Sequence, residues 1–246
     1  MSGASLLHGN VLSAAWLCAA RDGHVSSAVV SQAAMLTWFI IDYLAHERAH
    51  LYTFDLFAER CGAKLFWGCL CFYPYAYAVG SWAIVLYGDG SDGAGAAWGA
   101  PLVFLAGYAL SRGANNQKFA AKASRGRARV FYFPAAPWLR SCRLRIQQRA
   151  VPGSGGRLLC SGFWSLSRHV NYLGEVLMAL GIAAPAAAVL ARAWWWCPLP
   201  WLYPLYYVAL LGAREAADSK LCAGKYGRVW EEYTRLVPCR IVPGVW

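Results

Sequence analysis

The chain has little charge for its length. Of its 246 residues only 14% are Asp, Glu, Lys or Arg, whereas 59% are hydrophobic. A soluble domain carries about 25% charged residues. The composition therefore excludes an ordinary soluble core and predicts an all-α, polytopic membrane helix bundle. The 13 Trp and 14 Tyr residues agree with that interpretation, because both residue types gather at membrane interfaces.

Acidic residues are missing from the middle of the chain. The segment Arg112–Arg168 contains 12 Lys or Arg residues and no Asp or Glu. Under the positive-inside rule, such a segment predicts a cytosolic loop between membrane spans. Its positive charge would attract anionic lipid or a phosphorylated ligand. Nucleic acid is not an expected partner, because the loop is tethered between spans and carries no nucleic-acid-binding motif.

Several common site motifs are also missing. The nine cysteines include no CxxC pair and no neighbouring His or Cys at zinc-binding spacing, so we expect neither a metal site nor a disulfide framework. No GxGxxG motif follows an expected strand, which excludes a Rossmann dinucleotide site. The GSGG at Gly153–Gly156 is not followed by GKS or GKT, which excludes a phosphate-binding P-loop.

Long apolar runs are what the chain does have, and they predict about five transmembrane helices. Residues 1–28 are left unassigned, since the apolar patch Val11–Ala20 is shorter than the roughly 20 residues that a span needs. Pro74 is expected to kink the second span, and helical spacing runs through the C-terminal segment Arg214–Tyr233. The five runs are Val29–Ala45, Leu65–Gly88, Ala96–Leu110, Gly174–Ala193 and Trp195–Leu211.

The stretch Leu158–Glu175, LLCSGFWSLSRHVNYLGE, places polar residues at the mouth of the fourth apolar run. Ionisable and amide side chains beside a membrane span indicate a binding site. Trp and Tyr at headgroup level, with a snorkelling Arg, would give the same pattern in an interfacial belt. The residues alone leave both interpretations open. The polar residues concerned are Ser161, Arg168, His169, Asn171 and Tyr172.

This stretch resembles LLxSGxWGxxRHxNYLGD, the signature of the sterol reductase family. The family includes the sterol delta-14, delta-7 and delta-24(24(1)) reductases and the membrane domain of the lamin B receptor. Here Ser165 replaces the family's Gly and Glu175 replaces its Asp. Three further segments match, the last more weakly, and together the matches cover roughly residues 30–246. They are RGANNQK at Arg112–Lys118, the C-terminal block Arg214–Trp246, and YTFDLFAERCG at Tyr52–Gly62.

The resemblance implies NADPH-dependent reduction of a carbon-carbon double bond in a sterol intermediate of sterol biosynthesis, with delta-14 as the nearest match. It implies a multi-pass protein of the endoplasmic reticulum membrane, with a sterol reductase-like domain at 29–246 whose cofactor side is 112–246. A cytosolic loop and the C-terminal block would bind the cofactor, and sterol and membrane lipid would be partners. Cys69 and Gly80 stand where most members carry Asp and Gln near the substrate, which leaves the double bond's identity open.

Lys118 and Lys122 lie one helical turn apart, a spacing that suits either a phosphate group or anionic headgroups. The resemblance implies that they contact NADPH. It also implies that Tyr233, backed by Asp218, gives a proton to the sterol, and that Asp55 and Glu59 lie on the substrate side. The full set of implied NADPH contacts is Lys118, Lys122, Leu159, Trp164, Asn171, Tyr172, Asp218, Cys222, Lys225, Tyr226 and Tyr233.

Two other functions fit part of the sequence. The cluster RHxxYxGE and a C-terminal EEY resemble isoprenylcysteine carboxyl methyltransferases, which use S-adenosylmethionine but lack RGANNQK and the SGFW lead-in. A non-catalytic membrane protein like the lamin B receptor is the second alternative. Family members also have further spans ahead of the region matched here, so a missing N-terminal half or a protein partner is a further hypothesis.

Overall fold

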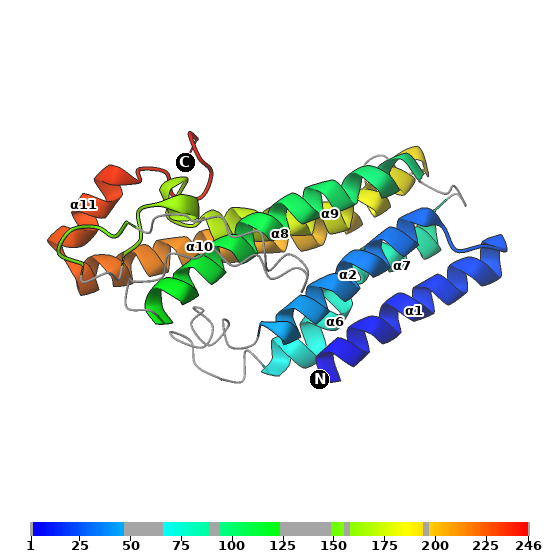
Figure 1. Cartoon of the computed structure of the whole chain (residues 1–246). Coiled ribbons are helices and arrows are strands. Elements are labelled where there is room, and N and C mark those ends of the chain that lie inside the picture. Colours follow the sequence, from blue (N-terminus) through cyan, green and yellow to red (C-terminus); the bar gives the residue numbers. More distant parts are fainter. Residues whose placement is uncertain are drawn as a thin grey trace, which may run out of the picture. The chain divides into compact units, whose positions relative to one another are not determined.

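The computed structural model describes residues 2–46, 66–88, 94–123, 149–154, 158–193 and 197–245. These residues are mostly helical, and among them the β-type pairing is limited to an isolated antiparallel bridge between Ala150 and Leu159. The predicted all-α fold is therefore confirmed (Figure 1). The chain divides into two compact units, which we describe separately: unit 1 is Met1–Leu105 with Leu177–Tyr207, and unit 2 is Ala106–Val176 with Val208–Trp246.

The described residues contain three helices long and apolar enough to cross a membrane. They coincide with the first, second and fourth of the predicted spans, which confirms a membrane helix bundle. The third predicted run falls in α8 (Ala94–Ala123), and the fifth falls partly in α10 (Leu202–Tyr226). The total of five spans stays a prediction. The three candidate spans are Ser27–Ala45, Gly68–Tyr87 and Val170–Ala191.

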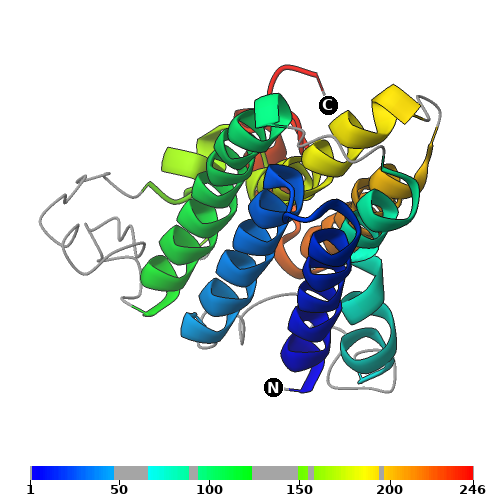
Figure 2. The same ribbon diagram turned by 90° about the vertical axis from the view of Figure 1, so that its right-hand side faces the viewer.

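Unit 1 begins with two helices that pack together. The first, α1 (Ser2–Asp22), contacts α2 (Ser27–Ala45), and Figure 1 and Figure 2 show them running side by side. Gly23, with a φ of 75°, allows the chain to reverse between them. Ser26 caps α2 by accepting a hydrogen bond from the Val29 N–H at 3.4 Å. Most of the unassigned segment 1–28 is thus a helix that belongs to this unit.

The second candidate span is interrupted. It starts as a π-helix, Gly68–Phe72, in which the Tyr73 N–H bonds to the Gly68 carbonyl. Pro74 has no N–H to donate to the preceding turn, and the helix continues as the short α6 (Tyr73–Ala76) before α7 (Val79–Tyr87). The helix type thus changes directly before Pro74, while the predicted kink itself stays a prediction.

Gln32 on α2 supplies the main polar contact of the unit 1 interior. The Gln32 side chain is 1% exposed; its Nε2 donates to the Ile182 carbonyl at 2.8 Å, and its Oε1 accepts from the Ser81 hydroxyl at 3.0 Å. A Cβ built on Gly80 would lie 2.5 Å from Gln32 Nε2. Gly80 therefore leaves room for the Gln32 amide. Most sterol reductases carry a Gln at the position of Gly80 itself.

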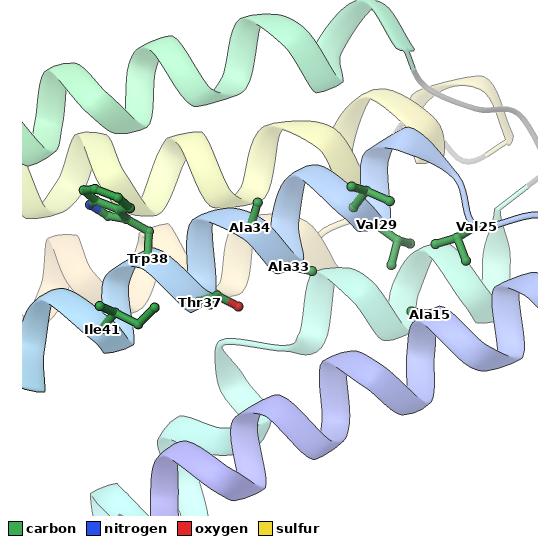
Figure 3. A pocket seen from close by; sticks show the side chains of 9 residues that line it. Ala15, Val25, Val29, Ala33, Ala34, Thr37, Trp38 and Ile41 are labelled. Atoms are coloured by element: carbon green, nitrogen blue, oxygen red, sulfur yellow. The ribbon is translucent and has the colours of Figure 1, made fainter.

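An apolar groove of about 500 Å³ follows α2 on unit 1 (Figure 3). It is lined by Ala15 of α1, by Val25 of the connection, and by Trp38 and Ile41 of α2, with Thr37 as its polar member. Trp38 and Ile41 are 39% and 57% exposed. The groove is thus an exposed, mainly apolar surface on a candidate span. None of the predicted site residues lines it.

Unit 2 differs from the sequence prediction at two helix ends. The fourth predicted run begins at Gly174, but α9 (Val170–Ala193) begins four residues earlier, so Asn171 and Tyr172 lie in its first turn. The helical spacing predicted through Arg214–Tyr233 is confirmed, but it is divided between two helices. Gly227, with a φ of 51°, ends α10 and starts a separate helix, α11 (Arg228–Leu236).

Candidate functional site

The site in unit 2 is framed by a contact between two of the motifs. Gly162 has a φ of 65° and opens a 3-10 turn, Gly162–Ser165, in the SGFW sequence. Gln117 of the RGANNQK motif holds the start of this turn, on either side of Gly162. Its Oε1 accepts from the Phe163 N–H at 3.1 Å, and its Nε2 donates to the Ser161 carbonyl at 3.0 Å. A Cβ on Gly162 would lie 2.6 Å from Gln117 Nε2, so a glycine is required here.

Trp164 links the same two motifs through its ring. The side chain is 7% exposed, and its Nε1–H donates to the Ala114 carbonyl at 3.0 Å. The Nζ of Lys118 lies over this ring, 5.4 Å from the centroid, within cation–π range. Leu159 packs in the same buried cluster as Trp164. Three of the implied NADPH contacts therefore lie together; the side chain of Lys122 lies outside the described part.

Asn171 and Tyr172 stand in the first turn of α9, beside this cluster. Asn171 Nδ2 donates to Asn115 Oδ1 at 3.3 Å, which joins the NY and RGANNQK motifs. Within the described part of the chain, the buried Asn171 Oδ1 has no hydrogen-bond partner. Tyr172 is 9% exposed and stacks on His169, with 4.9 Å between ring centroids.

His169 is the residue that the sequence prediction left out of the contact set. Burial, together with the nearby positive charges of Lys118 and Arg168, lowers its pKa to about 3, so the imidazole is neutral at neutral pH. Its Nδ1 lies 3.9 Å from Asp218 Oδ2, longer than a hydrogen bond. The RH pair in the sequence could have pointed to His169, but the family resemblance implies no NADPH contact for either residue of the pair.

The C-terminal tail runs along the RH pair. The backbone N–H groups of Arg168 and His169 donate to the Cys239 and Arg240 carbonyls at 3.0 and 2.8 Å. Ser167 Oγ donates to the Ile241 carbonyl at 2.8 Å. These bonds hold the RH pair against the end of the C-terminal block. The family resemblance implies that both segments belong to the cofactor site.

Glu215 on α10 anchors this tail from the other side. The carboxylate is fully buried; its Oε1 accepts from the Ser219 hydroxyl at 2.8 Å, and its Oε2 lies 3.5 Å from Arg240 Nη1. Ser219, one helical turn further along α10, thus satisfies one oxygen of this buried carboxylate. Sequence reasoning missed Glu215 because its partner lies in the tail, far along the chain.

Tyr233 lies in an apolar cluster on α11. It is 3% exposed and packs with Val151, Trp230 and Val237. Burial raises the pKa of Tyr233 above its ordinary value, and the positive charge of Arg168 opposes that rise. The phenol is therefore protonated at neutral pH, as a proton donor must be.

Three further implied contacts lie on α10 near this cluster. Cys222 and Tyr226 pack against it, and Cys222 Sγ is 4.0 Å from Asp218 Oδ1. Cys222 thus lies against the cluster that contains Tyr233 and beside Asp218, the two residues predicted to be catalytic. Lys225 is exposed, with its Nζ 5.3 Å from the centroid of the Tyr226 ring. The substrate-side residues Asp55 and Glu59 lie outside the described residues.

Comparison with known proteins covers nearly the whole chain. Residues 9–246 match the model of the ergosterol biosynthesis ERG4/ERG24 family, so the match starts upstream of the sequence motifs named above. The Delta(14)-sterol reductase of Arabidopsis thaliana is 34% identical over 92% of this chain and 54% of that protein. That of Methylotuvimicrobium alcaliphilum is 33% identical over 85% of the chain and 44% of that protein. The Mus musculus Delta(14)-sterol reductase TM7SF2 is 34% identical over the same shares, 85% and 44%. The chain spans about half the length of these relatives.

Proposed function

Because the chain belongs to the ergosterol biosynthesis ERG4/ERG24 family, we propose that it takes part in NADPH-dependent reduction of a sterol carbon-carbon double bond. The delta-14 bond is the first candidate, since the relatives described above are named Delta(14)-sterol reductases. The endoplasmic reticulum membrane is the proposed location. The observation that supports the proposal best is the meeting of the RGANNQK, SGFW and RHxNY segments in one site.

The side chains of this site suit a nicotinamide dinucleotide. Lys118 offers a cation for a phosphate group, while Trp164 and Leu159 offer an apolar wall. The buried Asn171 Oδ1, for which the described residues provide no donor, suits an N–H or O–H group of the ligand. Tyr172, next to it, adds a hydroxyl that donates or accepts. When bound, the cofactor supplies the hydride.

The protein itself has to supply a proton, because an isolated double bond is a very weak base. We propose that the Tyr233 hydroxyl holds this proton. The Arg168 charge, which lowers the pKa of Tyr233 against the effect of burial, would stabilise the phenolate left after transfer. Arg168 is itself fixed to the tail, with its Nη2 3.2 Å from the Pro238 carbonyl.

Binding of NADPH and NADH to the full chain in lipid nanodiscs tests the cofactor. Losing one charge-assisted contact costs on the order of 1.5–3 kcal/mol, so Lys118→Ala should weaken NADPH binding about tenfold or more. Lys220→Ala, which removes an exposed lysine of α10, is the matched control and should bind like the wild type. Equal NADPH affinity of Lys118→Ala and wild type would refute this contact.

The reaction is tested separately. Membranes that contain the chain are supplied with NADPH and with delta-14, delta-7 or delta-24(24(1)) sterols, and the reduced sterol is measured. Conversion of the delta-14 sterol supports the proposal, and conversion of another sterol corrects the position of the double bond. Tight binding of S-adenosylmethionine without sterol reduction would favour the methyltransferase alternative instead.

A further inference from the structure

One buried polar atom in unit 2 has no role in the function proposed above. The His169 side chain is 5% exposed, and its Nε2 has no hydrogen-bond partner within the described part of the protein. Leaving a buried acceptor or donor unpaired costs stability, so such atoms are rare unless a ligand or water completes them.

The position of the imidazole ring is fixed on several sides. One face stacks on Tyr172, with 14° between the ring planes. The backbone N–H of His169 is tied to the Arg240 carbonyl at 2.8 Å, and Ser167 beside it is tied to the Ile241 carbonyl. An imidazole held in this way presents Nε2 in one direction, which is what a binding contact needs.

The neighbouring carboxylate biases which ring nitrogen carries the proton. Asp218 Oδ2 lies on the Nδ1 side of the ring, at 3.9 Å. A negative charge there favours the tautomer with the proton on Nδ1, which leaves Nε2 as a hydrogen-bond acceptor. The matching ligand group is therefore a donor rather than an ionised phosphate or carboxylate group.

Two residues further along, Asn171 Oδ1 is a second buried acceptor for which the described residues provide no donor. A primary carboxamide is the part of a nicotinamide dinucleotide that carries two N–H donors on one nitrogen. We propose that His169 Nε2 accepts a hydrogen bond from the carboxamide N–H of the bound nicotinamide. The inference rests on the proposed use of a nicotinamide dinucleotide and adds a residue to its site.

The test compares two reduced dinucleotides on the full chain in nanodiscs. One is NADPH, and the other is its 3-acetylpyridine analogue, in which a methyl group replaces the carboxamide NH₂. The wild type should bind NADPH about fivefold more tightly than the analogue, the effect of one ordinary hydrogen bond. His169→Phe, which keeps a ring to stack on Tyr172, should bind the two equally. His169→Gln, whose amide oxygen takes the place of Nε2, should restore the preference.

Adenosine 2′,5′-bisphosphate, which lacks the nicotinamide half, serves as the control ligand. All variants should bind it like the wild type, which shows that they are folded. If His169→Phe is not recovered folded, His169→Leu carries the same test. The proposal is overturned if the wild type binds NADPH and the analogue equally, or if the variants without Nε2 keep the wild-type preference. A wild type that binds none of the three ligands would instead overturn the proposed function, and this inference with it.

Discussion

The two units treat their buried polar groups differently. In unit 1 the buried amide of Gln32 uses both of its ends, one on the Ile182 carbonyl and one on Ser81. Among the described residues, the buried side-chain atoms that lack a hydrogen-bond partner all belong to unit 2, with His169 Nε2 and Asn171 Oδ1 among them. The buried amide of unit 1 joins two helices, whereas His169 Nε2 and Asn171 Oδ1 in unit 2 have no hydrogen-bond partner among the described residues.

The difference has an energetic cost. A buried polar group without a partner destabilises a protein by about 1–3 kcal/mol, so we expect His169 Nε2 and Asn171 Oδ1 to lower stability until a ligand or water pairs with them. Functional sites commonly give up stability in this way, because groups that must bind a ligand are not all paired within the protein. Removing a polar group should therefore cost activity in unit 2 and stability in unit 1.

The largest effect is expected at Tyr233 in unit 2. Positioned acid catalysis is typically worth about a hundredfold to ten-thousandfold in rate. Tyr233→Phe keeps the ring in its apolar cluster and deletes the hydroxyl, so turnover should fall by that factor while NADPH affinity stays near the wild-type value. Tyr75→Phe, which removes an exposed hydroxyl from unit 1, is the control. Sterol reduction at the wild-type rate by Tyr233→Phe would place the donor elsewhere.

In unit 1, a substitution at Gln32 is expected to lower stability rather than activity. Gln32→Leu keeps a side chain of similar size but leaves the Ile182 carbonyl and the Ser81 hydroxyl without their partner. Each loss should cost roughly 1–3 kcal/mol of unfolding free energy, measured by denaturant unfolding in detergent. Asn171→Leu in unit 2 removes one 3.3 Å hydrogen bond and should cost less stability but weaken NADPH binding. Equal stability losses in the two variants would contradict the comparison.

Helix packing should not distinguish the units. A Cβ on Gly174 would meet the Gly107 carbonyl of α8 at 2.5 Å, and one on Gly181 in unit 1 would meet the Phe104 N at 2.8 Å. Gly174→Ala and Gly181→Ala should each lose about 1–3 kcal/mol from overpacking. Gly224→Ala, where a Cβ meets nothing within 4 Å, should instead gain up to about 1 kcal/mol from helix propensity. If Gly174→Ala and Gly181→Ala keep the wild-type unfolding free energy, the helices can move apart to make room for the added methyl group.

The sequence predicted the features that depend on local pattern. Apolar runs located the three candidate spans, Pro74 marked a change of helix type, and the motifs identified segments that meet in unit 2. The pattern gave no sign of the break at Gly227, because helical spacing continues on both sides of a residue whose φ of 51° ends the helix.

Contacts between distant residues left no local signal. Gln32 and Ile182 are 150 positions apart, and no periodicity connects an amide on one helix with a carbonyl on another. Glu215 and Arg240 were missed for the same reason. The unpaired state of His169 was also invisible, since a motif shows that a histidine is present but not what surrounds its two nitrogens.

The smallest expected effect concerns the charge on His169. The pKa of His169 is about 3 in the folded protein, against an ordinary value of about 6.5 for an unfolded chain. The unfolded state therefore binds the proton first as pH falls, so the folded state loses stability below pH 6.5. From pH 7 to pH 6 this one group should lower the unfolding free energy by about 0.7 kcal/mol. Lys118 and Arg168 disfavour the imidazolium, while the Asp218 carboxylate at 3.9 Å is the opposing charge.

Denaturant unfolding of wild type and His169→Gln at pH 7 and pH 6 measures this difference. The narrow range keeps clear of most carboxylates, whose ordinary pKa values are about 4. The wild type should lose about 0.7 kcal/mol more than the variant, and His24→Gln, which changes an exposed histidine of unit 1, controls for the substitution. If wild type and His169→Gln lose the same amount of unfolding free energy, protonating His169 costs no more in the folded protein than in water. The imidazole would then have a partner that satisfies it, and the contrast between Gln32 in unit 1 and His169 in unit 2 would fail.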